Sequence, residues 1–449
     1  MVSASREASL YKGPTGSLRH RCPECSATGP QLLRCSGCRA VRYCSREHQA
    51  AHRPKHKSAC NMIKKARAKV AEEEDRVRNM PPDFMTPANA FETHVGHFWG
   101  ILETRPYMRA RYALAGQHLA DMNTLDGVQE ALDHLRDMLR LCRGDNMGVR
   151  DRIPSLMLRL DFDQECYDFV KWWATVAHDS HYDWGDTDLP YLDIHCADVF
   201  EDPDFIADFA GLNHVVALIL IKLKLLIDIR NLNITRKVTA SRGLPVELRD
   251  LIELAVIRSP LSIKLQKATP KGLAKIEKKL MDQICRLGRT LTQTNEHFMF
   301  NLFEPDEALS ALPDVYSRGS WEEMALVMQS SYTAFWETEG VLDLLTDARA
   351  CAARDSADEI EDFMEDELAT ARAQSRPPRT PKEILEDISV NRIWGYLDYA
   401  VENASYLGPW SERPSERHRQ ENRAAWDMAD DEDAEWIIGS DRECLHLRC

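Results

Sequence analysis

The sequence predicts a mostly α-helical protein in which a small cysteine-rich segment is followed by a long helical, repeat-like body. Three observations support this fold class. Six of the thirteen cysteines lie between residues 22 and 60. Beyond residue 84, apolar residues recur at the three- and four-residue spacing of helices, whereas the alternation typical of strands is scarce. The hydrophobic content of 44% is that of a globular chain that can form a core.

The cysteine-rich segment has the spacing of a metal-binding region. It follows the pattern C-x2-C-x9-C-x2-C-x5-C-x3-H-x7-H-x3-C. A C-x2-C knuckle lets two thiolates of one tight turn bind the same tetrahedral zinc ion. Eight ligands make two closed sites of four, so the pattern predicts two structural zinc ions, Zn2+, rather than a catalytic one. The predicted metal ligands are Cys22, Cys25, Cys35, Cys38, Cys44, His48, His56 and Cys60.

The second half of this segment has a cysteine or histidine at every fourth residue from 44 to 60. On one unbroken helix each step of four residues drifts by about 40°, so a single helix could not point all of them at one ion. We expect Pro54 to break the run into two short helices. The first would carry Cys44 and His48, and the second would carry the last two ligands. His52 is then left over as a surface residue.

The run YCSREHQAAHRPKHKSAC, preceded by the two C-x2-C pairs, resembles a MYND-type zinc finger. The whole chain resembles the MYND-finger proteins with a long helical, tetratricopeptide-like region that are found in fungi. The finger itself covers 22–60 of the 449 residues. The resemblance implies two interleaved zinc sites. The implied ligand sets are Cys22, Cys25, Cys44 and His48 for one ion, and Cys35, Cys38, His56 and Cys60 for the other.

Two residues depart from the pattern of this family. Most members have Cys where this chain has His48, and zinc accepts either ligand. Most members also have Trp where this chain has Arg53. In relatives that bind proline-rich PxLxP peptides, that Trp and a neighbouring Gln contact the peptide. This chain keeps Gln49, so the resemblance implies binding of other proteins, through extended peptides at Gln49 and Arg53, with an altered preference.

Charge and composition limit the function classes. Residues 1–60 contain eleven Lys/Arg and three Asp/Glu, whereas residues 355–449 contain eleven Lys/Arg and twenty-four Asp/Glu. The acidic net charge of −15 argues against a general nucleic-acid binder. The amino terminus has no apolar signal-peptide region, and Lys222 and Lys224 interrupt the most apolar stretch, so we expect no membrane segment. Cysteines used as ligands suit a reducing compartment, either cytoplasmic or nuclear.

The predicted domains follow one another in chain order. They are a flexible tail (1–20), the zinc finger (21–61), a connecting helix and linker (62–83), the α-helical repeat-like body (84–351), an acidic, Pro-rich linker (352–381), and a C-terminal helical segment with an acidic tail (382–449).

Several helices of the body have clear signals. The clearest is an apolar stripe from 128 to 142, preceded by Thr124 as a plausible cap. The following segment reads as two helices joined near Asp161. Further helices are expected at about 203–230, 244–258, 269–288 and 320–346, and the helix-turn-helix lengths resemble degenerate tetratricopeptide hairpins.

An enzyme is the alternative interpretation, and residues 178–200 are its strongest support. This loop contains His178, Asp179, His181, Asp183, Asp186, Asp188, His195 and Cys196. Such a mixture could hold a metal or catalyse a hydrolysis, but no spacing in it matches a metalloenzyme motif. A SET-type methyltransferase would need strands and an Asn-His pair followed by small residues. Asn213-His214 is instead followed by a long apolar run.

The sequence therefore predicts a zinc-binding protein–protein interaction protein, adaptor or regulatory, without catalytic residues. A SET-type methyltransferase or a hydrolase, and nucleic-acid binding through the basic finger, are the other possibilities. The partner and the oligomeric state are not encoded in any pattern that we recognise.

Overall fold

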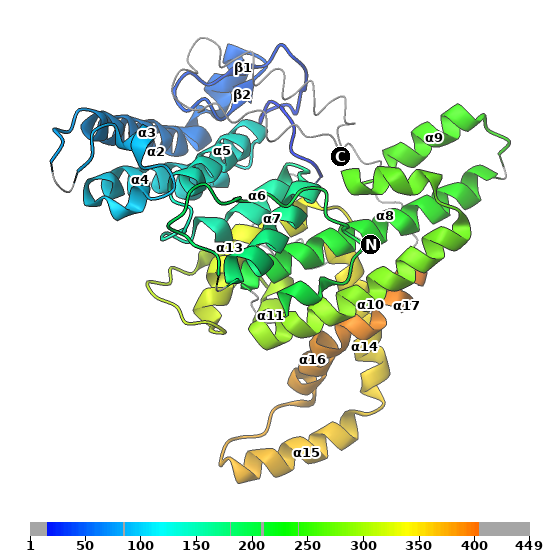
Figure 1. Ribbon diagram of the computed structural model, residues 1–449. Helices are drawn as coiled ribbons and strands as arrows, with labels where there is room; N and C mark the ends of the chain where they lie inside the picture. Colours follow the sequence, from blue (N-terminus) through cyan, green and yellow to red (C-terminus); the bar gives the residue numbers. More distant parts are fainter. Residues whose placement is uncertain (1–15, 84–85, 180, 208–210, 241, 404–449) are drawn as a thin grey trace. The chain divides into compact units, whose positions relative to one another are not determined.

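We describe the protein from a computed structural model that places residues 16–83, 86–179, 181–207, 211–240 and 242–403 (Figure 1). Within these ranges the chain forms sixteen α-helices, α2 to α17, and one two-stranded sheet, which confirms the mostly-α prediction. The chain divides into two compact units at residue 197, inside the body that was expected to run from 84 to 351. We call Ser17–Ala197 the finger unit, and the described residues from Asp198 to 403 the C-terminal unit.

The finger unit begins with a short hairpin and a long helix. Strands β1 (Leu33–Arg34) and β2 (Arg42–Tyr43) pair antiparallel. Helix α2 (Arg46–Arg78) follows, and the Ser45 hydroxyl caps it by accepting the His48 backbone N–H. The long helix contains both the end of the expected zinc finger and the expected connecting helix.

We expected Pro54 to break the helix, but α2 continues through this residue. A proline in a helix interior costs about 3 kcal/mol through one lost hydrogen bond and a clash with the preceding turn. Pro54 lies on the exposed side of α2, between His48 and His56. The two halves point at two different ions, so the 40° drift between successive ligands needs no break.

The remaining helices of the finger unit pack around α5 (Leu125–Leu141). The predicted cap is confirmed, because Thr124 Oγ1 accepts the Gly127 backbone N–H. The two helices expected around Asp161 are also present, and Asp161 has a positive φ of 60° at their junction. The other elements are α3 (Ala90–Thr93), α4 (Arg105–Tyr112), a π-helical turn (Ala113–Leu119), α6 (Ile153–Arg159) and α7 (Asp163–Thr175).

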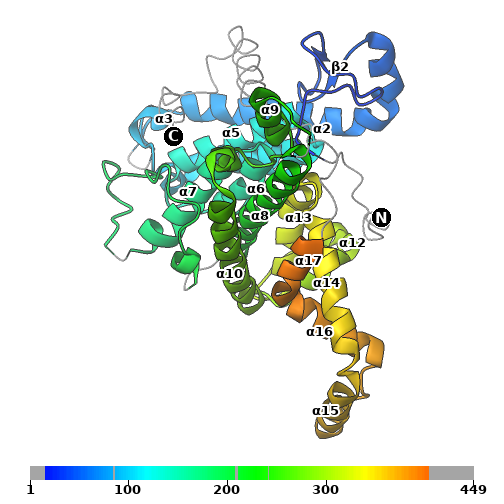
Figure 2. The ribbon, with the colours of Figure 1, turned by 90° about the vertical axis from the view of Figure 1, so that its right-hand side faces the viewer.

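The C-terminal unit is organised on two long helices, α8 (Leu212–Ala240) and α10 (Pro270–Thr294), which lie side by side in both views (Figures 1 and 2). Helix α8 is buried along most of its length, as its apolar sequence predicts. None of the described helices is long and apolar enough to cross a membrane. The other elements of this part are α9 (Val246–Ala255), a 3-10 helix (Pro260–Lys267), α11 (Phe298–Phe303), α12 (Asp306–Ser310), α13 (Trp321–Glu337) and α14 (Val341–Ala357).

The segment expected as an acidic linker, 352–381, is largely helical. Helix α14 extends into it, and α15 (Ile360–Ala373) follows. The carboxylate of Glu367 accepts hydrogen bonds from both Arg376 and Arg379, which folds the proline-rich stretch back onto α15. Helices α16 (Pro381–Arg392) and α17 (Leu397–Asn403) complete the unit, and the acidic tail of the expected last segment lies outside the described residues.

Candidate metal centre

The eight predicted ligands come together in two separate groups. The structure gathers them as Cys22, Cys25, Cys44 and His48 in the first cluster and as Cys35, Cys38, His56 and Cys60 in the second. These are the two interleaved sets that the family resemblance implies. The C-x2-C pairs lie in the loops before and after β1, whereas α2 contributes both histidines and Cys60. One straight helix therefore serves both clusters.

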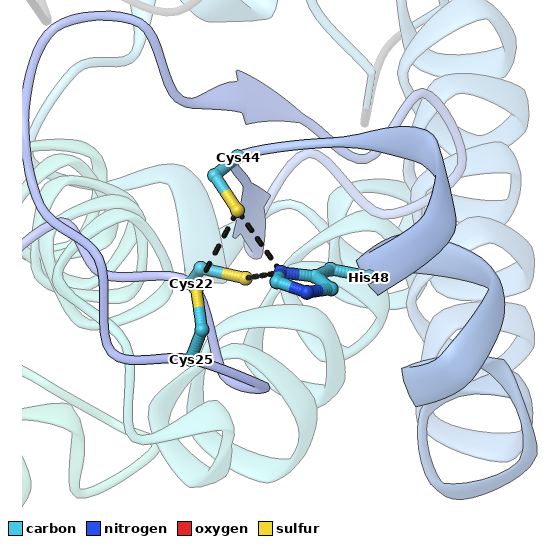
Figure 3. A group of neighbouring side chains, drawn as sticks. All are labelled: Cys22, Cys25, Cys44 and His48. Carbon is cyan, nitrogen blue, oxygen red and sulfur yellow. Dashed lines mark hydrogen bonds between the residues drawn. The ribbon is translucent and has the colours of Figure 1, made fainter.

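The first cluster is shown in Figure 3, where its four side chains converge on one point. The Sγ atoms of Cys25 and Cys44 are 3.5 Å apart. His48 presents Nδ1, which lies 3.0 Å from the Cys44 Sγ atom and 3.7 Å from the Cys22 Sγ atom. A tetrahedral zinc with Zn–S of about 2.3 Å and Zn–N of about 2.0 Å separates its ligand atoms by roughly 3.5 to 3.8 Å. Two of the three separations lie in this range and the Nδ1–Cys44 Sγ distance is shorter; three thiolates and one imidazole are a ligand set that zinc accepts.

The second cluster is more deeply buried than the first. All four of its residues are buried, whereas Cys25 in the first cluster is exposed. The Cys35 and Cys60 Sγ atoms are 3.8 Å apart, and His56 uses Nε2, which lies 3.4 Å from the Cys38 Sγ atom. These separations also match tetrahedral zinc. Both clusters are therefore closed Cys3His sites, which suits structural rather than catalytic zinc.

The electrostatics of the thiols also favour a cation in each cluster. Burial, together with the charges of Cys35 and Cys60, raises the pKa of the Cys38 thiol to about 12. Burial also acts to raise the pKa of Cys22, but backbone N–H groups of neighbouring residues lower it more, to about 6. Zinc binds thiolates and stabilises several of them side by side. A buried, crowded thiol such as Cys38 is suited to that role.

His52 lies outside both clusters, as expected from the sequence. Its Nδ1 atom is 2.9 Å from the Tyr43 hydroxyl, and its ring stacks on the His56 ring with centroids 5.6 Å apart. Burial is the largest of the effects that lower the pKa of His52. The residue therefore supports the ring of a ligand instead of binding metal itself.

The finger is attached to α5 by a buried group of charges that the sequence did not predict. The carboxylate of Asp126, in the first turn of α5, accepts two hydrogen bonds from the Arg42 guanidinium, at 2.7 and 2.9 Å. Arg34 and His20 also approach it, at 3.1 and 3.3 Å. Burial acts to raise the Asp126 pKa, but His20 and Arg42 lower it more, so the net shift is well below the usual range. This aspartate therefore joins Arg34 and Arg42 of the finger, together with His20 just before it, to the helical body.

A second connection runs directly from the second zinc cluster. Arg67 of α2 donates one hydrogen bond to the Cys38 carbonyl, at 2.9 Å. Its other hydrogen bonds go to both carboxylate oxygens of Glu130 on α5. The Thr124 hydroxyl adds a hydrogen bond to the Ala40 carbonyl. The metal-binding knuckle, α2 and α5 are thus held together through buried polar groups.

Three carboxylates of the 178–200 loop are used for local turns in the described residues. Asp179, Asp183 and Asp186 each accept the backbone N–H of the residue two positions later. Asp168 of α7 accepts the backbone N–H groups of Cys196 and Ala197, which fixes the far end of the loop. Among the described residues, the groups that could hold a metal are the two finger clusters, so this loop is not gathered into a third.

The residues singled out for a SET-type site lie in a different setting. Asn213 and His214 are part of the first turn of α8, and His214 is buried. In the part of the chain that the structure places, the β1–β2 hairpin of the finger is the only sheet. The strands on which a SET domain would depend are not found there.

His48 offers a direct test of the first cluster. His48→Cys should keep both zinc ions, because thiolate and imidazole both suit tetrahedral zinc. His48→Ala should open the first cluster and reduce the metal content from two zinc ions per chain towards one. Elemental analysis of the purified variants measures this. His52→Ala is the matched control and should keep two ions; full zinc content in His48→Ala would mean that another group is the ligand.

Comparison with known proteins agrees with this geometry. The family model of the MYND finger matches residues 22–60. No curated protein and no solved structure matches the chain. The match begins and ends on the first and last cysteines of the two clusters, and a MYND finger is in general a protein–protein interaction module. Residues 22–60 of this chain are therefore a MYND finger with two Cys3His zinc-binding clusters.

Proposed function

We propose that this protein is an adaptor or regulatory protein that binds extended, acidic peptide segments of other proteins along the exposed face of α2. The observation that carries the proposal is a stripe of cations on that face. Arg53, Lys57 and Lys64 are all exposed, as is Arg46 at the start of the helix. At 100° per residue these four lie within about 40° of one another, along roughly 27 Å of the helix.

Gln49 and Arg53 belong to the same side of α2. They are four residues apart, which places them about 40° apart around the helix. Gln49 is half-buried beside the finger and Arg53 is exposed. A Trp at this position would give a flat apolar platform for a proline ring, whereas a guanidinium prefers carboxylates. The proposed preference is therefore for peptides with acidic groups over neutral PxLxP peptides.

The two alternative function classes have less support. An enzyme would need reactive groups, and the carboxylates of the 178–200 loop accept backbone N–H groups instead. Nucleic acid could also bind a cationic stripe, but such interfaces add aromatic or base-reading side chains to the cations. The same face continues with Ala68, Ala71 and Asp75. The alanines offer no charge to a phosphate backbone, and the carboxylate of Asp75 would repel it.

The test is a titration of the full chain with acidic and neutral peptides at two salt concentrations. Lys57→Glu should weaken binding of the acidic set by about three- to fivefold, because each exposed ion pair contributes up to about 1 kcal/mol. High salt should weaken it as well. Arg53→Trp should lower the affinity for acidic peptides and raise that for PxLxP peptides.

Lys55→Glu is the matched control. Lys55 is equally exposed but lies about 160° away from Lys57 around the helix, so this variant should bind like wild type. Equal affinity for both peptide sets, unaffected by salt or by Arg53→Trp, would remove Arg53 from the recognition surface. Tighter binding of a single-stranded RNA of similar charge would favour the nucleic-acid alternative.

A further inference from the structure

Helix α9 presents a row of leucines to solvent. Leu251 is 63% exposed, and Leu248 and Leu254 are each 43% exposed. These residues are three apart, so they form a stripe about 120° wide along the helix. Val246 and Val238, at the start of α9 and near the end of α8, are exposed as well. A solvent-facing apolar stripe of this size marks an interaction surface.

The buried side of α9 carries a charged residue that is paired with α8. Glu253, which lies about 200° around the helix from Leu251, is the buried residue of α9. Its carboxylate accepts two hydrogen bonds from Arg236 of α8, at 2.9 and 3.0 Å. Arg236 also donates to the Gln266 and Ala268 carbonyls, which ties the 3-10 helix to the same point. The ion pair fixes the orientation of α9 and thereby turns its apolar stripe towards solvent.

The surroundings of α9 are basic. Lys237 adjoins Arg236 in α8, and Lys267 lies between the two carbonyls that Arg236 binds. Both lysines are exposed. The exposed cations of this region are Lys237, Arg242, Lys264, Lys267 and Lys271, against the exposed anions Glu247 and Asp250. An occupant of the stripe should therefore combine apolar side chains with negative charge.

One segment of this chain has that composition. Residues 426–438 read WDMADDEDAEWII, with no Lys or Arg. The apolar residues stand at the two ends of this segment, and the acids lie between them. The described chain ends at Asn403, where the Arg230 guanidinium of α8 donates to the Glu402 carbonyl. Residue 230 is only about 12 Å along α8 from Val238.

The intervening chain is long enough for the contact. Residues 404–425 could span up to about 70 Å when extended. A connection of this length would give an effective concentration on the order of 1 mM. We propose that the outward face of α9, with its surrounding lysines, is a docking surface whose occupant is the acidic, aromatic segment 426–438 of the same chain.

The experiment compares hydrogen exchange of the α9 amides, 246–255, in the full chain and in a chain that ends at residue 423. With an intrinsic dissociation constant of about 100 µM, docking should slow exchange by about tenfold in the full chain. A synthetic peptide of residues 424–440, added at millimolar concentration to the shorter chain, should restore the protection. Neutralising Asp430, Asp431, Glu432 and Asp433 in the full chain should remove it.

Two variants test the surface itself. Leu251→Asp should abolish the difference between the full and the shortened chain. Leu312→Asp changes an even more exposed leucine, 94% exposed in the loop after α12, and should leave that difference intact. Equal exchange in both chains would overturn the proposal. Protection that depends on protein concentration but not on the segment would assign the face to a second copy. Equal binding of both chains to anionic phosphatidylserine vesicles through α9 would assign it to a membrane surface.

Discussion

Cys38→Ser is expected to destabilise α5 as well as the finger that contains the substituted residue. Cys38 is a fully buried ligand of the second cluster, so its loss should release one of the two zinc ions. Structural zinc in small fingers contributes about 10–16 kcal/mol of folding free energy, and the finger has little other core. When the finger unfolds, Arg67 loses its hydrogen bond to the Cys38 carbonyl and is no longer held in place. Glu130 of α5 then loses the arginine with which it pairs. Leaving a buried charge unpaired costs about 3–5 kcal/mol.

Zinc content and native-state hydrogen exchange measure the two parts of this prediction. Exchange should accelerate over 125–141 in α5, whereas α10 in the C-terminal unit should be much less affected. Cys142→Ser is the matched control, because Cys142 is a buried cysteine of the same unit that binds no cluster. If Cys38→Ser loses its zinc but α5 exchanges as in wild type, the finger is an independent domain after all.

The metal ligands could be predicted from the sequence because their signal is local. Every ligand of a cluster lies within about 26 residues of the others, and the C-x2-C knuckles and four-residue steps are read directly from the spacing. The same holds for α5, where the apolar stripe and the Thr124 cap are neighbours in sequence. Local signals were misleading only where a stronger interaction acted on the same residues. Pro54 is the example, because α2 continues through this residue and the ligands on its two sides belong to different clusters.

The attachment of the finger to the body could not be predicted. Arg42 and Asp126 are 84 residues apart, and nothing in one sequence pairs a particular arginine with a particular aspartate. Asp126 has a second reason to be where it is, since an acid in the first turn of a helix is favourable. That position alone accounts for an acid there, so nothing in the sequence pointed to the buried ion group. The role of Glu367 could not be predicted for the same reason. An acidic, proline-rich stretch looks like a linker until it is known that Glu367 pairs with Arg376 and Arg379.

Asp126→Asn is expected to cost about 3–5 kcal/mol of unfolding free energy at neutral pH, since it removes the charge but keeps the shape of the side chain. The variant leaves Arg42, Arg34 and His20 around a neutral group in a buried site. Repulsion among these cations should loosen the finger from α5. Asp133→Asn is the matched control, because Asp133 lies on the same helix and accepts a local hydrogen bond from Gln129. Its effect should stay below about 1 kcal/mol.

The pH dependence distinguishes an ion pair from a simple hydrogen bond at this position. The pKa of Asp126 is lowered in the folded protein, so its stabilisation is fully present above the unfolded value of about 3.9 and is lost as the pH falls towards the folded value. The difference in unfolding free energy between wild type and Asp126→Asn should therefore be constant from pH 8 to 5 and shrink only below about pH 4. Denaturant unfolding at each pH, with the zinc content checked before and after, measures this. A difference that is already small at pH 7 would mean that the aspartate acts only as an acid in the first turn of the helix, and that the three cations do not depend on it.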